Sequence, residues 1–299
     1  MKLNKLSCRD KKMFIRYLNL KRHDLAVYNF NNIYIWSSLF DIYWALENNN
    51  LCVFFKDKLG SFLYLPALGK NIKSEVIAQA FGVMDRFNPN PENSRIENVE
   101  EKDLSFFRDL GYVGVLKSHD YLCLRSDLAQ LKGNSFKAKR ASGNYFIKHY
   151  SFERLPFSLK YKNGCLELYR QWMKNRKGAF PDLVYQGMLE DSLKSLKVLL
   201  DNYKDLDCLG WLVKIKNQVK AFSFGFKLNS QTFCILYEIT DLSIKGLAQF
   251  IFRSFCIELK GNKHINIMDD SGLENLKKVK LSYHPVKLIP SYIVKRQGL

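Results

Sequence analysis

Three acidic positions in the C-terminal half have the chemistry that a binding or catalytic site needs. Glu238 closes an apolar run that starts at Phe233 and has the pattern of a buried strand. A carboxylate there can act as a general base or bind an amine, and the competing interpretation is an ion pair with a nearby lysine. Asp269 and Asp270 follow the apolar run 264–268. They could bind a cationic group or cap the next helix, and for Asp270 we favour the cap.

Other common catalytic arrangements do not occur in the sequence. His264 and His284 have no cysteine or aspartate at catalytic or metal-binding spacing, so we interpret both as structural. The seven cysteines are scattered, odd in number and never spaced as Cys-x-x-Cys. This argues against a zinc site or a disulfide framework and favours a reducing compartment. We expect no metal, and we find no Ser–His–Asp triad and no pair of glycosidase carboxylates.

The stretch 131–150, LKGNSFKAKRASGNYFIKHY, gathers positive charge near the middle of the chain. Wound as a helix at about 100° per residue, it has a narrow polar face formed by Lys137, Arg140, Asn144 and Lys148. The opposite face is expected to be buried and holds Phe136, Gly143, Phe146, Ile147 and Tyr150. Lys139 falls in the apolar arc, so it must reach out along its stem or point into a polar cleft.

Phosphate binding is the function that this basic stretch favours. The cations that we assign to it are Lys132, Lys137, Lys139, Arg140 and Lys148. Such contacts give affinity with little sequence specificity, and Arg125 and Lys117 could extend the strip. The competing interpretation is a solvated basic face, because charge patterning alone is weak evidence.

Composition supports a basic globular protein of about two domains. The 299 residues are 47% apolar, and 47 bases against 29 acids give a net charge of +18. Such a charge attracts nucleic acid, anionic membrane or phosphorylated ligands. A Lys- and Asn-rich genome could produce part of it, although that bias would also raise Glu. The first 25 residues lack the apolar core of a signal peptide, and polar residues interrupt the apolar run 28–46. We therefore expect a cytoplasmic protein that can still touch a membrane surface.

The predicted elements follow the same order twice. In the first half we predict strands over 51–56, 61–65, 95–99 and 121–125, and helices over 72–87 and 102–110. In the second half we predict strands over 209–216, 219–227, 232–239, 264–268 and 287–295, and helices over 166–174, 185–202, 246–259 and 273–280. Alternation, helical spacing and turn residues mark them.

An acidic pair sharpens the match between the halves. Apolar residues follow Glu100-Glu101 and Asp269-Asp270 at the same intervals. We predict an α/β fold with an internal duplication, each copy a mixed sheet flanked by helices. The expected domains are 1–130 and 151–299, joined by a basic helix over 131–150.

Three stretches resemble a family of soluble proteins related to the C-terminal domain of phosphatidylglycerol lysyltransferase. The first is YNFNNIYIW at 28–36. The second is DYLCLRSDL at 120–128, followed by LKG at 131–133 and KAKR at 137–140. The third is INIMDD at 265–270, followed by GL, LKKVK, SY and Pro285. With the segments between them they cover nearly the whole chain, and the third is the most specific.

This resemblance implies two tandem N-acetyltransferase-like (GNAT) domains joined by a basic helix. It also implies aminoacyl transfer from charged tRNA to an amine or hydroxyl, on a lipid or another acceptor. The related Fem-type peptidoglycan transferases share the fold, and their glycine turn is similar to Glu238–Asp241 followed by Ile244-Lys245-Gly246. The chain departs from the lipid-modifying enzymes in having no transmembrane region. It also lacks the RxxGxG/A phosphate loop of acetyl-CoA users.

The implied chemistry gives roles to several residues of the second half, where we expect the active cleft. Transfer from a reactive ester needs positioning and a cation or N–H group for the oxyanion. Lys280 is the candidate cation, Tyr283 a proton donor and Glu238 a base; ordinary alternatives are a helix-end lysine and a packed aromatic ring. The candidate substrate-binding residues are Asp269, Asp270, Lys245 and Gly246.

Two other functions remain open on the sequence. One is acyl-CoA-dependent N-acyltransfer, which the missing phosphate loop disfavours. The other is non-enzymatic binding of RNA or anionic lipid. We expect no resident cofactor, because aminoacyl-tRNA or acyl-CoA would be the donor substrate.

Overall fold

The computed structural model describes residues 1–297. Contacts divide the chain into two compact units. Unit 1 holds Met1–Asp120, Asp269–Glu274 and a C-terminal stretch that begins at Leu288. Unit 2 holds Tyr121–Met268 and Asn275–Lys287. This division differs from the expected boundaries, because the basic stretch lies within unit 2 and the last strand belongs to unit 1.

Unit 1 is a mixed sheet with helices. Its strands are β1 (Asn4–Lys5), β2 (Asp41–Glu47), β3 (Asn50–Lys56), β4 (Ser61–Leu63), β5 (Ile96–Glu100), β12 (Lys287–Arg296) and the first part of β6 (Tyr112–Leu124). Its α-helices are α1 (Lys11–Leu18), α2 (Phe30–Tyr34), α3 (Ser74–Phe87) and α4 (Leu104–Asp109). Short 3-10 turns are η1 (Cys8–Asp10), η2 (Ile35–Ser38), η3 (Pro91–Asn93) and η4 (Glu101–Asp103).

The strands of unit 1 lie in the order β1-β2-β3-β4-β5-β12-β6. The pairs from β1 to β4 are antiparallel, β4 and β5 are parallel, and β5 and β12 are antiparallel. The predicted hairpin of β3 and β4 is confirmed. The turn between them is stabilised by Asp57, whose carboxylate accepts hydrogen bonds from the N–H groups of Leu59 and Gly60.

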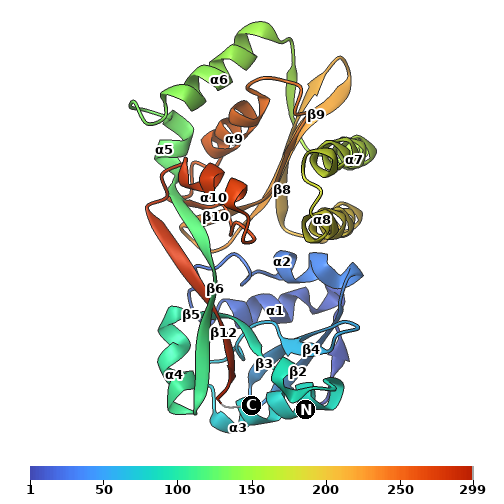
Figure 1. Cartoon of the computed structure of the whole chain (residues 1–299), viewed down its shortest axis with the longest axis vertical. Coiled ribbons are helices and arrows are strands. Elements are labelled where there is room, and N and C mark those ends of the chain that lie inside the picture. Colours follow the sequence, from blue (N-terminus) through green and yellow to red (C-terminus); the bar gives the residue numbers. More distant parts are fainter. Residues whose placement is uncertain (298–299) are drawn as a thin grey trace. The chain divides into compact units, whose positions relative to one another are not determined.

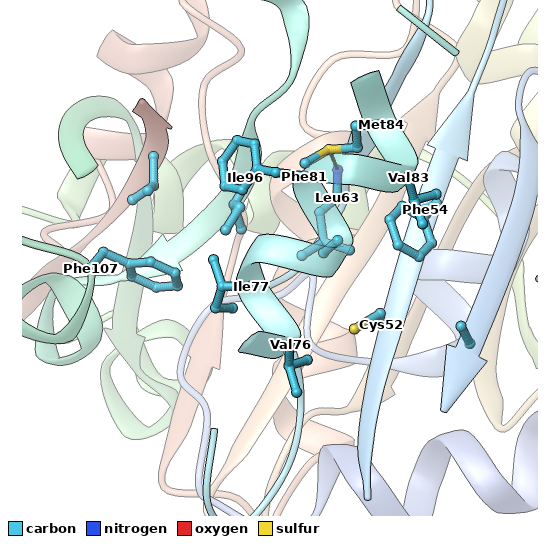
Figure 2. Close-up of a cluster of buried hydrophobic side chains, with 14 of the residues drawn as sticks. Cys52, Phe54, Leu63, Val76, Ile77, Phe81, Val83, Met84, Ile96 and Phe107 are labelled. Carbon is cyan, nitrogen blue, oxygen red and sulfur yellow. Dashed lines mark hydrogen bonds between the residues drawn. The ribbon is translucent and has the colours of Figure 1, made fainter. Parts of the chain in front are cut away.

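The core of unit 1 forms where α3 packs on the sheet (Figure 2). Apolar residues recur along α3 at helical spacing, and Ile77, Phe81 and Met84 are fully buried. They meet side chains of β3, β4 and β5 such as Phe54 and Ile96. This amphipathic spacing is why the sequence alone locates the helix.

Unit 2 is a second mixed sheet with helices. Its strands are the end of β6, then β7 (Glu153–Pro156), β8 (Cys208–Ile215), β9 (Gln218–Lys227), β10 (Thr232–Thr240) and β11 (His264–Asn266). Its helices are α5 (Arg125–Gln130), α6 (Lys137–His149), η5 (Leu159–Tyr161), α7 (Lys162–Ala179), α8 (Leu183–Asp201), α9 (Leu247–Glu258) and most of α10 (Glu274–Leu281).

Helices cover both faces of the unit 2 sheet. The strand order is β6-β11-β10-β9-β8-β7, and only β10 and β11 run parallel. Helix α9 lies on one face, while α7 and α8 lie on the other (Figure 1). Residues 221–226 of β9 are therefore buried on both sides of the strand.

The element order of the two halves repeats as predicted. Strands β2-β3-β4 are followed by α3, β5, α4 and β6, and strands β8-β9-β10 by α9, β11, α10 and β12. The last strands pair in an exchanged way. Strand β6 pairs antiparallel with β11, and β12 pairs antiparallel with β5. Unit 1 thus contains nearly all of β12, the closing strand of the second half, while β6, the closing strand of the first half, ends in unit 2.

The basic helix differs in detail from its prediction. It begins at Lys137 rather than Leu131, because Leu131 has a left-handed φ of 51° and ends α5. Gly143 and Phe146 are buried against α9, as expected. The prediction was wrong for Ile147, which is 51% exposed. The contact with α9 is narrow, so residues at its margin remain in solvent.

Two further features bear on chemistry and location. All seven cysteines are free thiols. Within residues 1–297 no helix combines the length and the apolar character that crossing a bilayer requires.

Candidate active site

The candidate site lies where two strands of unit 2 diverge. Strand β10 pairs with β11 only over Thr232–Cys234. Beyond Cys234, β10 continues to Thr240 beside β9, with a bulge between Ile235 and Tyr237. The chain leaves β11 through a left-handed residue, Met268, whose φ is 60°. Within the described chain, no strand pairs with this edge of β10 beyond Cys234, and Glu238 lies on that stretch.

Glu238 is half-buried, and its surroundings do little to stabilise a negative charge on the carboxylate. Its side chain makes no hydrogen bond or ion pair with any residue of the described range 1–297. Burial raises the pKa of this carboxyl to about 8, and the positive charge of Lys280 only partly opposes that rise. A carboxyl with a pKa near the working pH can take up and release protons, which is the property of a general base.

Lys280 extends from the last turn of α10 toward the same region. Its ammonium donates a hydrogen bond to the carbonyl oxygen of Ile267 and lies 5.9 Å from the ring centroid of Tyr121. Its charge also acts on the thiol of Cys123, whose pKa burial raises to about 12. Lys280 is half-buried rather than the surface lysine of the alternative interpretation. It therefore places a positive charge close to Glu238.

Tyr283 is buried between the ring of Phe252 and the ammonium of Lys139. Its ring lies 4.5 Å from that of Phe252 and 4.3 Å from the ammonium of Lys139. Burial, and then the negative charge of Glu238, raise the pKa of the phenol well above its usual value. The phenol therefore stays protonated, and its O–H can donate a hydrogen bond, but the raised pKa disfavours the predicted role of proton donor. This packing also agrees with the structural interpretation of Tyr283.

Only part of the predicted phosphate strip faces solvent. Lys132, Lys137 and Lys148 are exposed. Lys139 instead donates to the hydroxyl of Ser282 at 2.6 Å, and burial lowers the pKa of its ammonium. Arg140 donates to the carbonyl oxygens of Leu131 and Gly133, and so it holds the turn before α6.

The two proposed extensions of the strip are engaged elsewhere. Arg125 donates to the carbonyl oxygen of Cys256 at 3.4 Å. In unit 1, Lys117 donates to Glu97 at 2.7 Å and to Asn98 at 2.9 Å. Both cations thus have partners within their own units.

Lys245 and Gly246 take part in the contact between α6 and α9. The Lys245 ammonium lies 4.6 Å from the ring centroid of Tyr145 on α6. Gly246 precedes α9 with a φ of 82°, and a Cβ there would stand 2.0 Å from the carbonyl oxygen of Ser142. Close helix packing is therefore sufficient to explain this glycine, and its role in anion binding stays a prediction.

The acidic pair Asp269-Asp270 lies in the turn before α10. Asp269 accepts from the N–H of Ser271 at 3.2 Å, and Asp270 accepts from that of Gly272 at 2.9 Å. Both belong to unit 1, whereas Glu238, Lys280 and Tyr283 belong to unit 2. The structure thus brings the three predicted catalytic residues together, and binding by the acidic pair stays a prediction.

Sequence reasoning missed the surroundings of this site. Tyr121 and Cys123 come from β6 and Cys256 from α9, and no spacing in the sequence links them to Glu238. It also missed a buried cluster in unit 1. Glu100 accepts hydrogen bonds from His23 at 2.8 Å and from the N–H of Asp24 at 3.0 Å.

The unit 1 cluster is electrostatically satisfied, in contrast to Glu238. Although burial favours the protonated form, hydrogen bonding and charge from His23, with Lys102, lower the pKa of Glu100 to about 2. The acidic pair was the one signal in the sequence for this carboxylate. Within the described residues, no three His, Cys, Asp or Glu side chains gather as a metal site would require.

The repeated strand order and the diverging strands are those of tandem acetyltransferase-like proteins. A tandem GNAT protein from the clavulanic acid biosynthesis pathway is similar in structure, with a TM-score of 0.51 and 7% identity over 100% of this chain and 99% of that chain. The chain belongs to the family described as phosphatidylglycerol lysyltransferase, C-terminal, whose model matches residues 20–295. The predicted family and fold class are thereby confirmed.

Solved structures agree with this membership. A conserved protein of unknown function from Bacteroides thetaiotaomicron VPI-5482 has a TM-score of 0.89 and 24% identity, over 99% of this chain and 100% of that one. L-PGS from Bacillus licheniformis has a TM-score of 0.65 and 16% identity, over 97% and 93%. FemX has a TM-score of 0.60 and 9% identity, over 100% and 96%. No curated protein matches in sequence.

Proposed function

We propose that this protein transfers an aminoacyl group from charged tRNA to an amine or hydroxyl acceptor, such as that of a lipid. The observation that carries the proposal is Glu238, a half-buried carboxyl with a pKa of about 8 on the open edge of β10. Membership of a family named for lysyl transfer to phosphatidylglycerol supports the reaction class.

In the proposed reaction the acceptor nitrogen or oxygen attacks the ester carbonyl carbon of the donor. Glu238 takes the proton that the acceptor loses as the new bond forms. The ester bond to the tRNA ribose oxygen then breaks, and that oxygen receives the proton. Because the donor ester is already reactive, the protein mainly has to position the reactants.

Lys280 has the charge needed to stabilise the oxyanion of the tetrahedral intermediate. Its ammonium donates to the Ile267 carbonyl, which holds the charge in the site. The positive charge also favours the ionised, proton-accepting form of Glu238. Tyr283 supports this arrangement by holding Lys139 and Phe252 beside α10.

The test is transfer of label from radiolabelled aminoacyl-tRNA to separate lipid, peptide and small-amine acceptors by the purified protein. We expect Glu238→Gln to reduce the rate by about 10²–10⁴-fold, the usual contribution of general base catalysis. The wild-type rate should fall as the pH is lowered through about 8, because the carboxylate becomes protonated.

Glu167→Gln is the matched control, since Glu167 is an exposed carboxylate on α7 of the same unit. It should keep the wild-type rate. Equal rates for Glu238→Gln and wild type would remove Glu238 from the mechanism. Label moving from acetyl-CoA but from no aminoacyl-tRNA would replace the proposal with acyl-CoA-dependent transfer.

A further inference from the structure

The turn between α7 and α8 exposes apolar side chains that the fold does not need. We call residues 178–184 the α7–α8 tip. Leu183 is 81% exposed and Val184 is 73% exposed, and Phe180 beside them is 38% exposed. Tyr185, the next residue of α8, and Leu189 further along the helix are buried. The apolar surface of the tip is therefore additional to the face that packs α8 against α7.

The tip is held in a defined shape. The carboxylate of Asp182 accepts a hydrogen bond from the N–H of Tyr185 at 2.6 Å and so caps α8. The N–H of Phe180 donates to the carbonyl oxygen of Arg176 at 3.0 Å and closes the end of α7. The outward direction of Leu183 and Val184 in the first turn of α8 is thus built into the helix start.

The α7 side of the tip is basic, whereas α8 carries Glu190 and Asp191. Arg170, Lys174, Arg176 and Lys177 lie on the last turns of α7, and Asp182 is the one acid between residues 170 and 184. Lys177 is paired with Glu190, whereas Lys174 is exposed. At 1.5 Å per residue, Arg176 and Lys174 lie about 5 and 8 Å along α7 from its end. Cations at that depth would meet a phosphate layer if the apolar tip lay just beneath it.

We propose that the α7–α8 tip inserts into the surface of a bilayer that contains anionic lipid. Two outward apolar side chains, Leu183 and Val184, with the partly exposed Phe180 ring packed on Tyr185 beside them and cations of α7 one to two turns behind, match the boundary between acyl chains and headgroups. RNA would satisfy the cations, but it offers no apolar environment to Leu183 and Val184. The inference does not rest on the transferase activity, because membrane binding needs neither donor nor acceptor.

The experiment is co-sedimentation of the full chain with vesicles of phosphatidylcholine alone and of phosphatidylcholine mixed with phosphatidylglycerol. We expect binding to the mixed vesicles and much weaker binding to the neutral ones. Leu183→Ser combined with Val184→Ser should weaken binding at least about tenfold, because several apolar carbons lose their lipid contact. Leu59→Ser is the matched control, since Leu59 is 80% exposed on the β3–β4 turn, and it should bind as wild type does.

A second variant tests insertion directly. Leu183→Trp keeps the tip apolar, and its additional fluorescence should shift to shorter wavelength and be quenched by brominated lipid, while Leu59→Trp should show neither change. Unchanged vesicle binding by the double serine variant, or no shift for Leu183→Trp, would overturn the proposal. So would loss of tRNA binding in the double variant without any vesicle binding by wild type, which would make the tip an RNA contact.

Discussion

At the scale of single residues, the buried Glu100 and the half-buried Glu238 show how surroundings decide chemistry. Glu100 receives hydrogen bonds from His23 and Asp24 and stays ionised, with a pKa of about 2. Glu238 has no such partner in residues 1–297, and its pKa is about 8. Both stand at the end of strands predicted from the sequence, so their positions could be predicted. Their difference could not, because the groups around them come from distant segments.

The raised pKa of Glu238 predicts a pH-dependent cost in stability. The unfolded carboxyl ionises near pH 4.5 and the folded one near pH 8. The folded protein therefore has its full stability below pH 4.5, where the carboxyl is protonated in both states. This contribution to the free energy of unfolding is lost as the pH rises through about 8. The whole shift corresponds to about 5 kcal/mol, and solvent contact of the half-buried group reduces the expected effect to about 2 kcal/mol.

Glutamine cannot ionise, so Glu238→Gln should be more stable than wild type above pH 8 and equally stable below pH 4.5. Urea unfolding across this pH range measures the difference. Glu167→Gln, at an exposed site, should show no such trend. A constant difference at every pH would mean that Glu238 has an ordinary pKa.

At the scale of elements, the contact of α6 with α9 depends on Gly246. Alanine there must adopt a φ of 82° and place its Cβ 2.0 Å from the Ser142 carbonyl oxygen. Left-handed backbone costs about 1–2 kcal/mol and overpacking about 1–3 kcal/mol. We therefore expect Gly246→Ala to lower the free energy of unfolding by about 3 kcal/mol.

Gly187→Ala provides the comparison in a thermal unfolding series. A Cβ at Gly187, within α8, meets no atom within 4 Å, so this change should stabilise by about 0.5–1 kcal/mol. If both substitutions had the same small effect, the packing of α6 on α9 would be looser than the structure shows.

The exposed cations of α6 give a separate prediction about RNA. Lys137 and Lys148 are exposed, whereas Arg140 holds the turn at Leu131 and Gly133. If α6 contacts the acceptor end of tRNA, replacing Lys137 and Lys148 by alanine should lower the salt slope of binding by about 1.4, at about 0.7 per contact on a single strand. Filter binding over a range of salt concentrations measures it.

Arg140→Ala should act through stability instead, because the two carbonyl oxygens lose their donor. A salt slope that is unchanged by the double lysine variant would exclude α6 from the tRNA site. Helical spacing predicted the cationic face, but it could not distinguish a cation that binds a ligand from one that binds its own backbone.

At the scale of the whole molecule, the order of elements could be predicted far better than their pairing. Periodicity and turn residues located β3 and β4, the run β8-β9-β10 and the helices α3, α9 and α10, but they predicted no separate strand at β2. They gave no sign that β12 pairs with β5 and β6 with β11. An alternating strand carries information about its two faces but little about its neighbours. A domain that ends at the predicted boundary, residue 130, therefore lacks β12, the strand that pairs with β5.

The exchange of strands predicts that residues 1–130 alone will not fold stably. The buried residues Ile289, Ser291 and Val294 of β12 belong to unit 1, and Val294 is part of the core cluster around α3. A fragment without them exposes that core and the edge of β5. Circular dichroism and thermal unfolding should show a weak or absent transition.

The same fragment with residues 286–297 joined through a Gly/Ser linker should regain a cooperative transition, because the added strand restores the antiparallel partner of β5. The extended fragment with Val294→Asp in the added strand is the matched control. It should not regain a cooperative transition, since a charge would enter a fully buried position. Cooperative unfolding of the unextended fragment would show that unit 1 closes its sheet without β12.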